Sequence, residues 1–191
     1  MPPEPAGAGK SGFDLMDGPL FIKNLALQGD DVFLDLGCGR GNFSFAAAEY
    51  IGTQGTIHAV DMWAEGVAAV EARARLEGIT QIQAHRANAG EALPLPDVSV
   101  DICLMAVVLH DLVDEDNHTT ALKEIARVLK PGGRLAVVEF NRIDGPPGPP
   151  KHIRLAPSEV FEMLRPYGFD DPTETMLNRH LYLTEFQKDP K

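Results

Sequence analysis

The stretch that most constrains the fold is an apolar run that leads into a glycine-rich turn, residues 32–41, with the sequence VFLDLGCGRG. Apolar residues without alternation are typical of a strand that is covered on both faces. Gly37, Gly39 and Gly41 allow the backbone to turn sharply and to approach a ligand closely. A helix starting at about Asn42 would direct its positive end toward this loop. The stretch therefore predicts a site for a nucleotide-like cofactor at the end of a buried strand.

Two details of this loop argue against a dinucleotide. The pyrophosphate fingerprint is G-x-G-x-x-G, and its third glycine would fall at position 42, which is Asn42. Asp35 lies two residues before the first glycine, where a carboxylate would repel a pyrophosphate. It would suit a cofactor that carries positive charge. S-adenosylmethionine fits, because it carries a sulfonium and an ammonium group and has no phosphate.

A second acidic residue fits the same site. Residues 56–61, TIHAVD, are expected to form the next strand, which ends in Asp61. A carboxylate at the tip of the second strand of a βαβ unit can accept hydrogen bonds from two ribose hydroxyls. NAD sites and S-adenosylmethionine sites share this feature, so Asp61 alone does not choose between the two cofactors.

Four segments, in order and spacing, resemble the class I S-adenosylmethionine-dependent methyltransferases, especially the small-molecule enzymes of the ubiquinone/menaquinone-biosynthesis type. These segments are DLGCGRG at 35–41, VDM at 60–62, LPLPD at 93–97 leading into VDIC at 100–103, and RVLKPGGRL at 127–135. The resemblance covers roughly residues 25–187. It implies the fold and the cofactor, with S-adenosylhomocysteine as product, but not the acceptor.

The resemblance also implies which residues hold the cofactor. Asp35 and the glycine loop would hold its methionine part, Asp61 its ribose and Met62 its adenine. Residues after the third and fourth expected strands would complete the site. The full predicted set is Asp35, Gly37, Cys38, Gly39, Gly41, Asp61, Met62, Asn88, Ala89, Met105, Ala106 and Val107. Plain core packing is the alternative for Met62 and Val107.

Strand and helix patterns alternate along the chain. Strands are expected at 32–36, 56–60, 82–86, 100–107 and 135–140, and a hairpin is expected from 173–177 and 180–186. Helices are expected at 21–27, 42–50, 63–76, 157–167 and from Asp114 to Lys130. The predicted fold is a three-layer, Rossmann-like α/β fold with a mostly parallel seven-stranded sheet and one antiparallel strand near its edge. Residues 1–20 are expected to be a flexible segment or lid, and 21–188 a single domain.

Composition limits the classes of molecule that the protein is expected to bind. The formal net charge of −11 disfavours nucleic acid and anionic membranes. The two cysteines indicate a reducing compartment, and no apolar run reaches the length of a membrane span. We therefore expect a cytoplasmic protein with a small-molecule partner, no nucleic acid and no membrane insertion. Homodimerisation stays open, and no residue cluster has the spacing of a metal site.

His110 and Asp111 follow the fourth expected strand directly. Histidine titrates near neutrality, so His110 is a candidate general base, and Asp111 a candidate substrate contact. The alternative is that His110 only lines the cofactor pocket or caps the next element. His152 and Arg154 follow a proline-rich stretch and could bind an anionic or enolic substrate, or could be solvated loop charges. Segments 13–21 and 142–154 are expected to form a lid.

The predicted function is transfer of a methyl group to a small molecule by in-line displacement. Two alternatives remain: a protein that binds S-adenosylmethionine or S-adenosylhomocysteine without catalysis, and an NAD(P)-dependent oxidoreductase. Asn42 and Asp35 weigh against the oxidoreductase.

Overall fold

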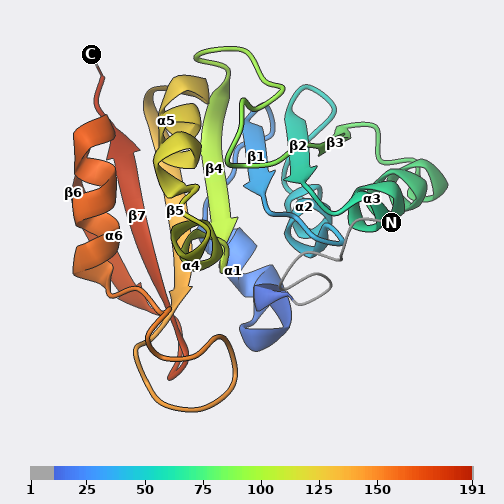
Figure 1. Cartoon of the computed structure of the whole chain (residues 1–191). Coiled ribbons are helices and arrows are strands. Elements are labelled where there is room, and N and C mark those ends of the chain that lie inside the picture. The colour runs from blue at the N-terminus through green and yellow to red at the C-terminus, as the bar shows by residue number, and fades with distance from the viewer. Residues whose placement is uncertain (1–10, 191) are drawn as a thin grey trace.

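The computed structural model describes residues 11–190 and places their strands in one seven-stranded sheet. The strands are β1 (Val32–Leu36), β2 (Thr56–Asp61), β3 (Ile82–Arg86), β4 (Val100–Ala106), β5 (Leu129–Phe140), β6 (Phe169–Met176) and β7 (Leu181–Lys188). Their order is β3-β2-β1-β4-β5-β7-β6 (Figure 1). β7 runs antiparallel to β5 and β6, and β1 to β5 pair in parallel. The predicted fold class is confirmed.

Helices cover both faces of the sheet. They are α1 (Gly18–Asn24), α2 (Asn42–Ala47), α3 (Ala64–Glu77), α4 (Leu109–Asp114), α5 (His118–Val128) and α6 (Pro157–Leu164), with short 3-10 turns η1 (Gly12–Leu15) and η2 (Arg165–Tyr167). α1, α2 and α3 contribute Ile22, Phe43 and Val70 to the apolar core on one face. α4, α5 and α6 contribute Leu109, Ile125 and Val160 to the core on the other. Within residues 11–190, no helix has the length and apolar character needed to cross a bilayer.

The prediction was wrong about where one helix begins. Asp114 was expected to cap a helix that runs to Lys130, but it is the last residue of α4, and α5 begins four residues later at His118. Leu109 and Leu112 are buried, so an extra turn of helix forms before the expected cap. The chain then reverses at Asp116, which has a left-handed φ of 57°. β5 likewise begins at Leu129, six residues before the expected strand.

The carboxyl ends of the parallel strands are covered by three segments that lie far apart in the sequence. Figure 1 shows the N-terminal turns, α4 and the loop after β5 gathered at this end of the sheet. The ring of Phe13 in η1 packs edge-on against Phe43 at a centroid distance of 5.1 Å. The side-chain amide of Asn178, between β6 and β7, donates to the carbonyl of Leu15 at 2.9 Å. Residues 1–10 of the expected flexible segment lie outside the described residues.

Candidate functional site

The glycine-rich loop between β1 and α2 leaves one stretch of backbone accessible. Gly37, Gly39 and Gly41 have φ values of 77°, 54° and 77°. A Cβ added at Gly37 would lie 2.4 Å from Cγ2 of Val108, and one added at Gly41 would lie 2.8 Å from Cγ2 of Val70. At Gly39 nothing lies within 4 Å of the same position. The loop is therefore packed at both ends and open at its centre, where a ligand can approach the backbone.

Backbone N–H groups of this loop are used inside the protein. Those of Gly37 and Cys38 donate to the carbonyl of Val60 at 2.8 and 3.1 Å. The N–H of Gly39 donates to Asp61 Oδ2 at 2.7 Å, and that of Gly41 donates to the carbonyl of Cys38 at 2.8 Å. Loops that bind phosphate direct free N–H groups at the anion. These four donors are not free to bind a pyrophosphate.

Asp61 connects the tip of β2 to the glycine loop. Besides the bond from Gly39, its Oδ1 accepts a hydrogen bond from the N–H of Trp63 at 2.8 Å. A carboxylate oxygen can accept two hydrogen bonds, so each oxygen of Asp61 keeps a free acceptor position. The half-buried side chain can therefore hold the loop and still accept hydrogen bonds from a ligand's hydroxyl groups.

Asp35 lies beneath the loop and is fully buried. The hydroxyl of Ser44 in α2 donates to its Oδ2 at 2.6 Å. Burial raises the pKa of Asp35 to about 7, and the nearby Asp61 carboxylate contributes to this increase. The sequence argument treated Asp35 as a permanent negative charge that faces the cofactor. In the structure the side chain packs against α2 instead, and its charge at neutral pH is partial.

A cavity of about 150 Å³ lies between the glycine loop and the N-terminal turn. Four of the predicted cofactor residues line it: Gly37, Cys38, Gly39 and Ala106. Sequence reasoning missed the others, which are Ser11, Gly12, Asp14, Arg40, Asn42 and Phe43. Pockets for small ligands usually measure about 300–1,000 Å³. The segment Ser11–Asp14 therefore closes this cleft to less than the usual size.

The remaining predicted cofactor residues lie outside this cavity. Met105 is fully buried in the core beneath α5. Met62 is about half exposed. Asn88 Oδ1 accepts a hydrogen bond from the N–H of Gly90 at 2.9 Å, which closes a local turn, and Ala89 packs against the α5-side core. Met105 therefore packs in the core and not in this cavity, whereas core packing, the alternative for Met62, does not fit the exposure of Met62.

Val107, just after β4, has strained backbone. Its φ is 58°, a left-handed value that is costly for a β-branched residue. Its N–H donates to the carbonyl of Val138 at 2.8 Å, which fixes this conformation. A Cβ on Gly12 would lie 3.2 Å from Cγ2 of Val107, so the residue borders the N-terminal turn. Strain of this kind concentrates at functional sites.

His110 is held by a carboxylate that sequence reasoning missed. Its Nδ1 lies 2.8 Å from Oε2 of Glu139, and its backbone N–H donates to Oε1 of the same residue at 3.1 Å. Glu139, near the end of β5, is fully buried. Burial lowers the pKa of His110, but the hydrogen bond and the charge of Glu139 outweigh burial, so the pKa is raised overall. Nε2 of His110 lies 3.4 Å from Oδ1 of the half-exposed Asp111.

The two predicted substrate residues in the loop after β5 differ in their surroundings. His152 is exposed. Arg154 is buried, and it donates four hydrogen bonds of 2.7–3.0 Å to carbonyl oxygens of residues 141–149. Its guanidinium also lies 5.4 Å from the centre of the Phe140 ring. Arg154 therefore organises the proline-rich loop, and most of its donors are used for that purpose.

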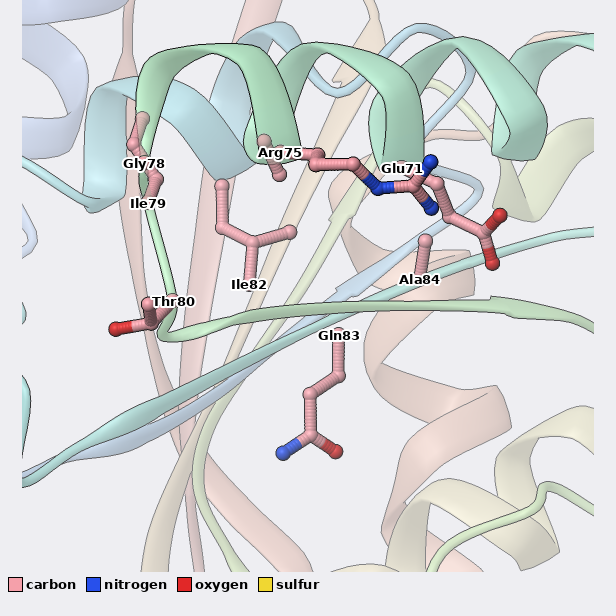
Figure 2. Close-up of a pocket in the computed structure, with 9 residues that line it drawn as sticks. Glu71, Arg75, Gly78, Ile79, Thr80, Ile82, Gln83 and Ala84 are labelled. Atoms are coloured by element: carbon pink, nitrogen blue, oxygen red, sulfur yellow. The ribbon is translucent and has the colours of Figure 1, made fainter.

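A second hollow lies away from these residues. It measures about 590 Å³ and lies between the C-terminal half of α3 and β3, with Glu71, Arg75 and Gln83 among its lining residues (Figure 2). It opens beside Ile82, the first residue of β3, and so near the amino ends of the parallel strands. Ligands of open α/β sheets bind at the opposite, carboxyl end. None of the predicted site residues lines it.

Residues 34–137, just over half of the chain, match the family described as "Methyltransferase domain". The chain belongs to this family. Membership confirms the resemblance seen in the sequence, and S-adenosylmethionine is the cofactor of the family.

Curated relatives of the chain are named as methyltransferases of a naphthoquinone or of quinone biosynthesis. The chain is 34% identical over 119 residues to the chloroplastic 2-phytyl-1,4-beta-naphthoquinone methyltransferase of Arabidopsis thaliana, covering 61% of this chain and 44% of that protein. It is also 34% identical over 125 residues to the ubiquinone/menaquinone biosynthesis C-methyltransferase UbiE of Hydrogenovibrio crunogenus, covering 65% and 48%. The chain thus spans about half the length of the curated relatives it matches.

Solved structures share the fold. A SAM-dependent methyltransferase from Aquifex aeolicus is similar with a TM-score of 0.82 and 24% identity, covering 93% of both chains. The [4+2]-cyclase SpnF is similar with a TM-score of 0.75 and 20% identity, covering 90% of this chain and 80% of that one. The second name belongs to another reaction class, so the fold alone does not fix the reaction.

Proposed function

We propose that this chain transfers a methyl group from S-adenosylmethionine to a small-molecule acceptor and releases S-adenosylhomocysteine. The observation that carries the proposal is the glycine loop, in which the N–H groups of Gly37, Cys38, Gly39 and Gly41 are paired internally. The carboxylates of Asp61 and of the buried Asp35 lie beside this loop, and Asp14 lines the same cavity. This arrangement disfavours a dinucleotide and suits a cationic cofactor. The quinone methyltransferases among the relatives support a small-molecule acceptor.

The residues at the site fit this cofactor. Asp61 would accept hydrogen bonds from the ribose hydroxyls through its two free acceptor positions. The open backbone at Gly39 would lie against the ligand. Asp35 would act from beneath the loop through its charge, because a bound cation favours the ionised carboxylate. Ser11–Asp14 would exclude water from above the loop, after moving to admit the cofactor.

When bound, S-adenosylmethionine supplies a methyl group that its sulfonium already activates. The protein then contributes mainly alignment and exclusion of water, which can lower the barrier by about 7–11 kcal/mol. His110 would accept a proton from the acceptor at Nε2, and Asp111 would contact the acceptor at the exposed side of α4. The reduced state of Cys38 and Cys103, both buried free thiols, fits the cytoplasmic location that we also propose.

The experiment is calorimetric titration of the full chain with S-adenosylhomocysteine and, in parallel, with NADH. We expect binding of the first ligand and none of the second. A preference for NADH would replace the proposal by the oxidoreductase alternative. A screen with methyl-labelled S-adenosylmethionine and a broad set of acceptors then tests catalysis. Tight binding without transfer of label to any acceptor would favour the non-catalytic alternative.

A further inference from the structure

The carboxylate of Glu139 contacts His110 at two points. Oε1 accepts the backbone N–H of His110, and Oε2 pairs with Nδ1 of its ring. The two residues are 29 positions apart in the sequence, so this contact depends on the pairing of β4 with β5. One rigid carboxylate therefore fixes both the start of α4 and the orientation of the ring that α4 carries.

Burying the carboxylate of Glu139 within the core costs folding free energy. Its side chain has no exposed surface, and a buried carboxylate without partners is strongly destabilising. The nearby guanidinium of Arg154 is already bound to four loop carbonyls. The ring of His110 is thus the group that forms the short side-chain bond to Glu139. This arrangement resembles the general pattern in which a third group orients a catalytic base.

The contact sets which nitrogen of the ring can accept a proton. A carboxylate accepts hydrogen bonds, so Nδ1 carries the hydrogen and the neutral ring presents the lone pair of Nε2. Nε2 lies 3.4 Å from Oδ1 of Asp111, whose side chain is 42% exposed, while the side chain of His110 itself is only 6% exposed, so an acceptor would have to reach this nitrogen past Asp111. The charged groups near the ring are Glu139 on β5, Asp111 on α4 and Arg154 in the proline-rich loop. The two carboxylates favour the imidazolium that forms when Nε2 gains a proton.

We infer that Glu139 is a positioning residue for His110, and that the pair selects an acceptor which loses a proton from oxygen as it is methylated. This inference rests on the proposed function. In the step, the O–H bond of a phenol or enol breaks and its proton moves to Nε2. The freed electron pair, on oxygen or on a conjugated carbon, forms the bond to the methyl carbon. The carbon–sulfur bond breaks, and its electrons stay on sulfur.

The first test requires neither a variant nor an acceptor. In the full chain labelled with ¹⁵N-histidine, the NMR shifts of His110 report its tautomer and its titration. We expect the neutral ring to carry its hydrogen on Nδ1, and its titration midpoint to decrease in Glu139→Gln. Glu185→Gln on β7 makes the same change in a carboxylate outside this pair, and should leave the midpoint unchanged. A hydrogen on Nε2, or a midpoint that does not move in Glu139→Gln, would overturn the inference.

The second test measures turnover with two probes, 1,4-dihydroxynaphthalene, which has hydroxyl protons, and dimethyl sulfide, which has none to lose. We expect label on the first probe only. His110→Gln should lower its rate about 100-fold or more, the range typical of a general base. Glu139→Gln should lower the rate at least tenfold and move the acidic limb of the pH profile to lower pH. Methylation of dimethyl sulfide at equal rates in wild type and His110→Gln would overturn the inference, as would an unchanged profile shape in Glu139→Gln.

Binding of S-adenosylhomocysteine keeps the two proposals distinct. Both variants should bind it as the wild type does, because neither residue lines the cofactor cavity. If the wild type fails to bind it, the proposed function fails, whatever the NMR result. If it binds and the tautomer is wrong, only the role of Glu139 fails.

Discussion

Replacing Asp35 by Asn should stabilise this protein, and the gain should increase with pH. The folded pKa of Asp35 is about 7, against an ordinary value of 3.8, because burial disfavours the charged form. A carboxyl group whose pKa is raised by folding contributes stability that is complete below its unfolded pKa. That contribution is lost as the pH rises through the folded pKa. Asparagine has no charge to bury, and its carbonyl can still accept the hydrogen bond from Ser44.

The magnitude follows from the two pKa values. One pKa unit corresponds to about 1.4 kcal/mol. Between pH 5 and pH 8 the penalty on ionised Asp35 therefore grows by roughly 2–3 kcal/mol, since the change levels off near pH 7. For a domain of this size, such a difference corresponds to roughly 5–10 °C in melting temperature. The melting temperature of Asp35→Asn minus that of the wild type should therefore be larger at pH 8 than at pH 5 by this amount.

The assay is thermal unfolding of both proteins across this pH range. Comparing them at each pH cancels the titration of all other groups. Asp170→Asn is the control, because it removes an exposed carboxylate on β6. Its melting temperature should differ from that of the wild type by the same amount at every pH. If Asp35→Asn is destabilised at pH 8, or if its gain does not change with pH, then the carboxylate is not buried and neutral in the way described.

Four further outcomes are expected. Calorimetry should show that the affinity of the wild type for S-adenosylmethionine increases from pH 6 to pH 8, because only an ionised carboxylate attracts the sulfonium. Asp35→Asn should show no such increase, and equal pH dependence in the two proteins would exclude an electrostatic role for Asp35. Asp61→Ala should weaken binding of S-adenosylhomocysteine at least tenfold, and unchanged affinity would remove the ribose role. Burial lowers the pKa of His58 to about 4, while the unfolded residue protonates near 6.5. Urea unfolding should therefore show that the stability of the wild type relative to His58→Gln falls by roughly 1–2 kcal/mol between pH 6.5 and pH 4, a value that allows for solvent screening. Comparing the two proteins cancels the opposite change from Asp35, and a difference that does not vary with pH would contradict the prediction. Arg154→Ala should cost about 3 kcal/mol through lost hydrogen bonds to carbonyls, and a loss below about 1 kcal/mol would contradict its role in the loop.

The sequence was sufficient for the order of the seven strands, because apolar runs and glycines separate them at regular spacing, but it did not predict α4 as a separate helix. Helix ends were harder. Asp114 has the properties of a helix cap, but the burial of Leu109 and Leu112 extends helix in front of it. Capping preferences are weak compared with the free energy gained from burying two leucines.

Of the residues that line the cavity, the sequence predicted three glycine-loop residues and Ala106 at the end of β4. Glu139 falls within an apolar strand, and nothing in the sequence pairs it with a histidine 29 residues away. Ser11 and Asp14 approach the loop from a distant part of the sequence, in a segment whose Phe13 packs on Phe43. The environment of Asp35 was also hidden, since its position before the glycines indicates a carboxylate but not that Ser44 covers it. The pairing of Glu139 with His110, the approach of Ser11 and Asp14, and the burial of Asp35 all depend on contacts between residues that are distant in the sequence or on different elements.

The way Arg154 holds its loop has a consequence for how such proteins diversify. Its partners are main-chain carbonyls, and every amino acid supplies one. Side chains at many positions of the surrounding stretch can therefore be exchanged without removing the bonds that shape it. A single arginine can in this way preserve the backbone conformation of the proline-rich loop while the side chains of the loop change to suit new acceptors.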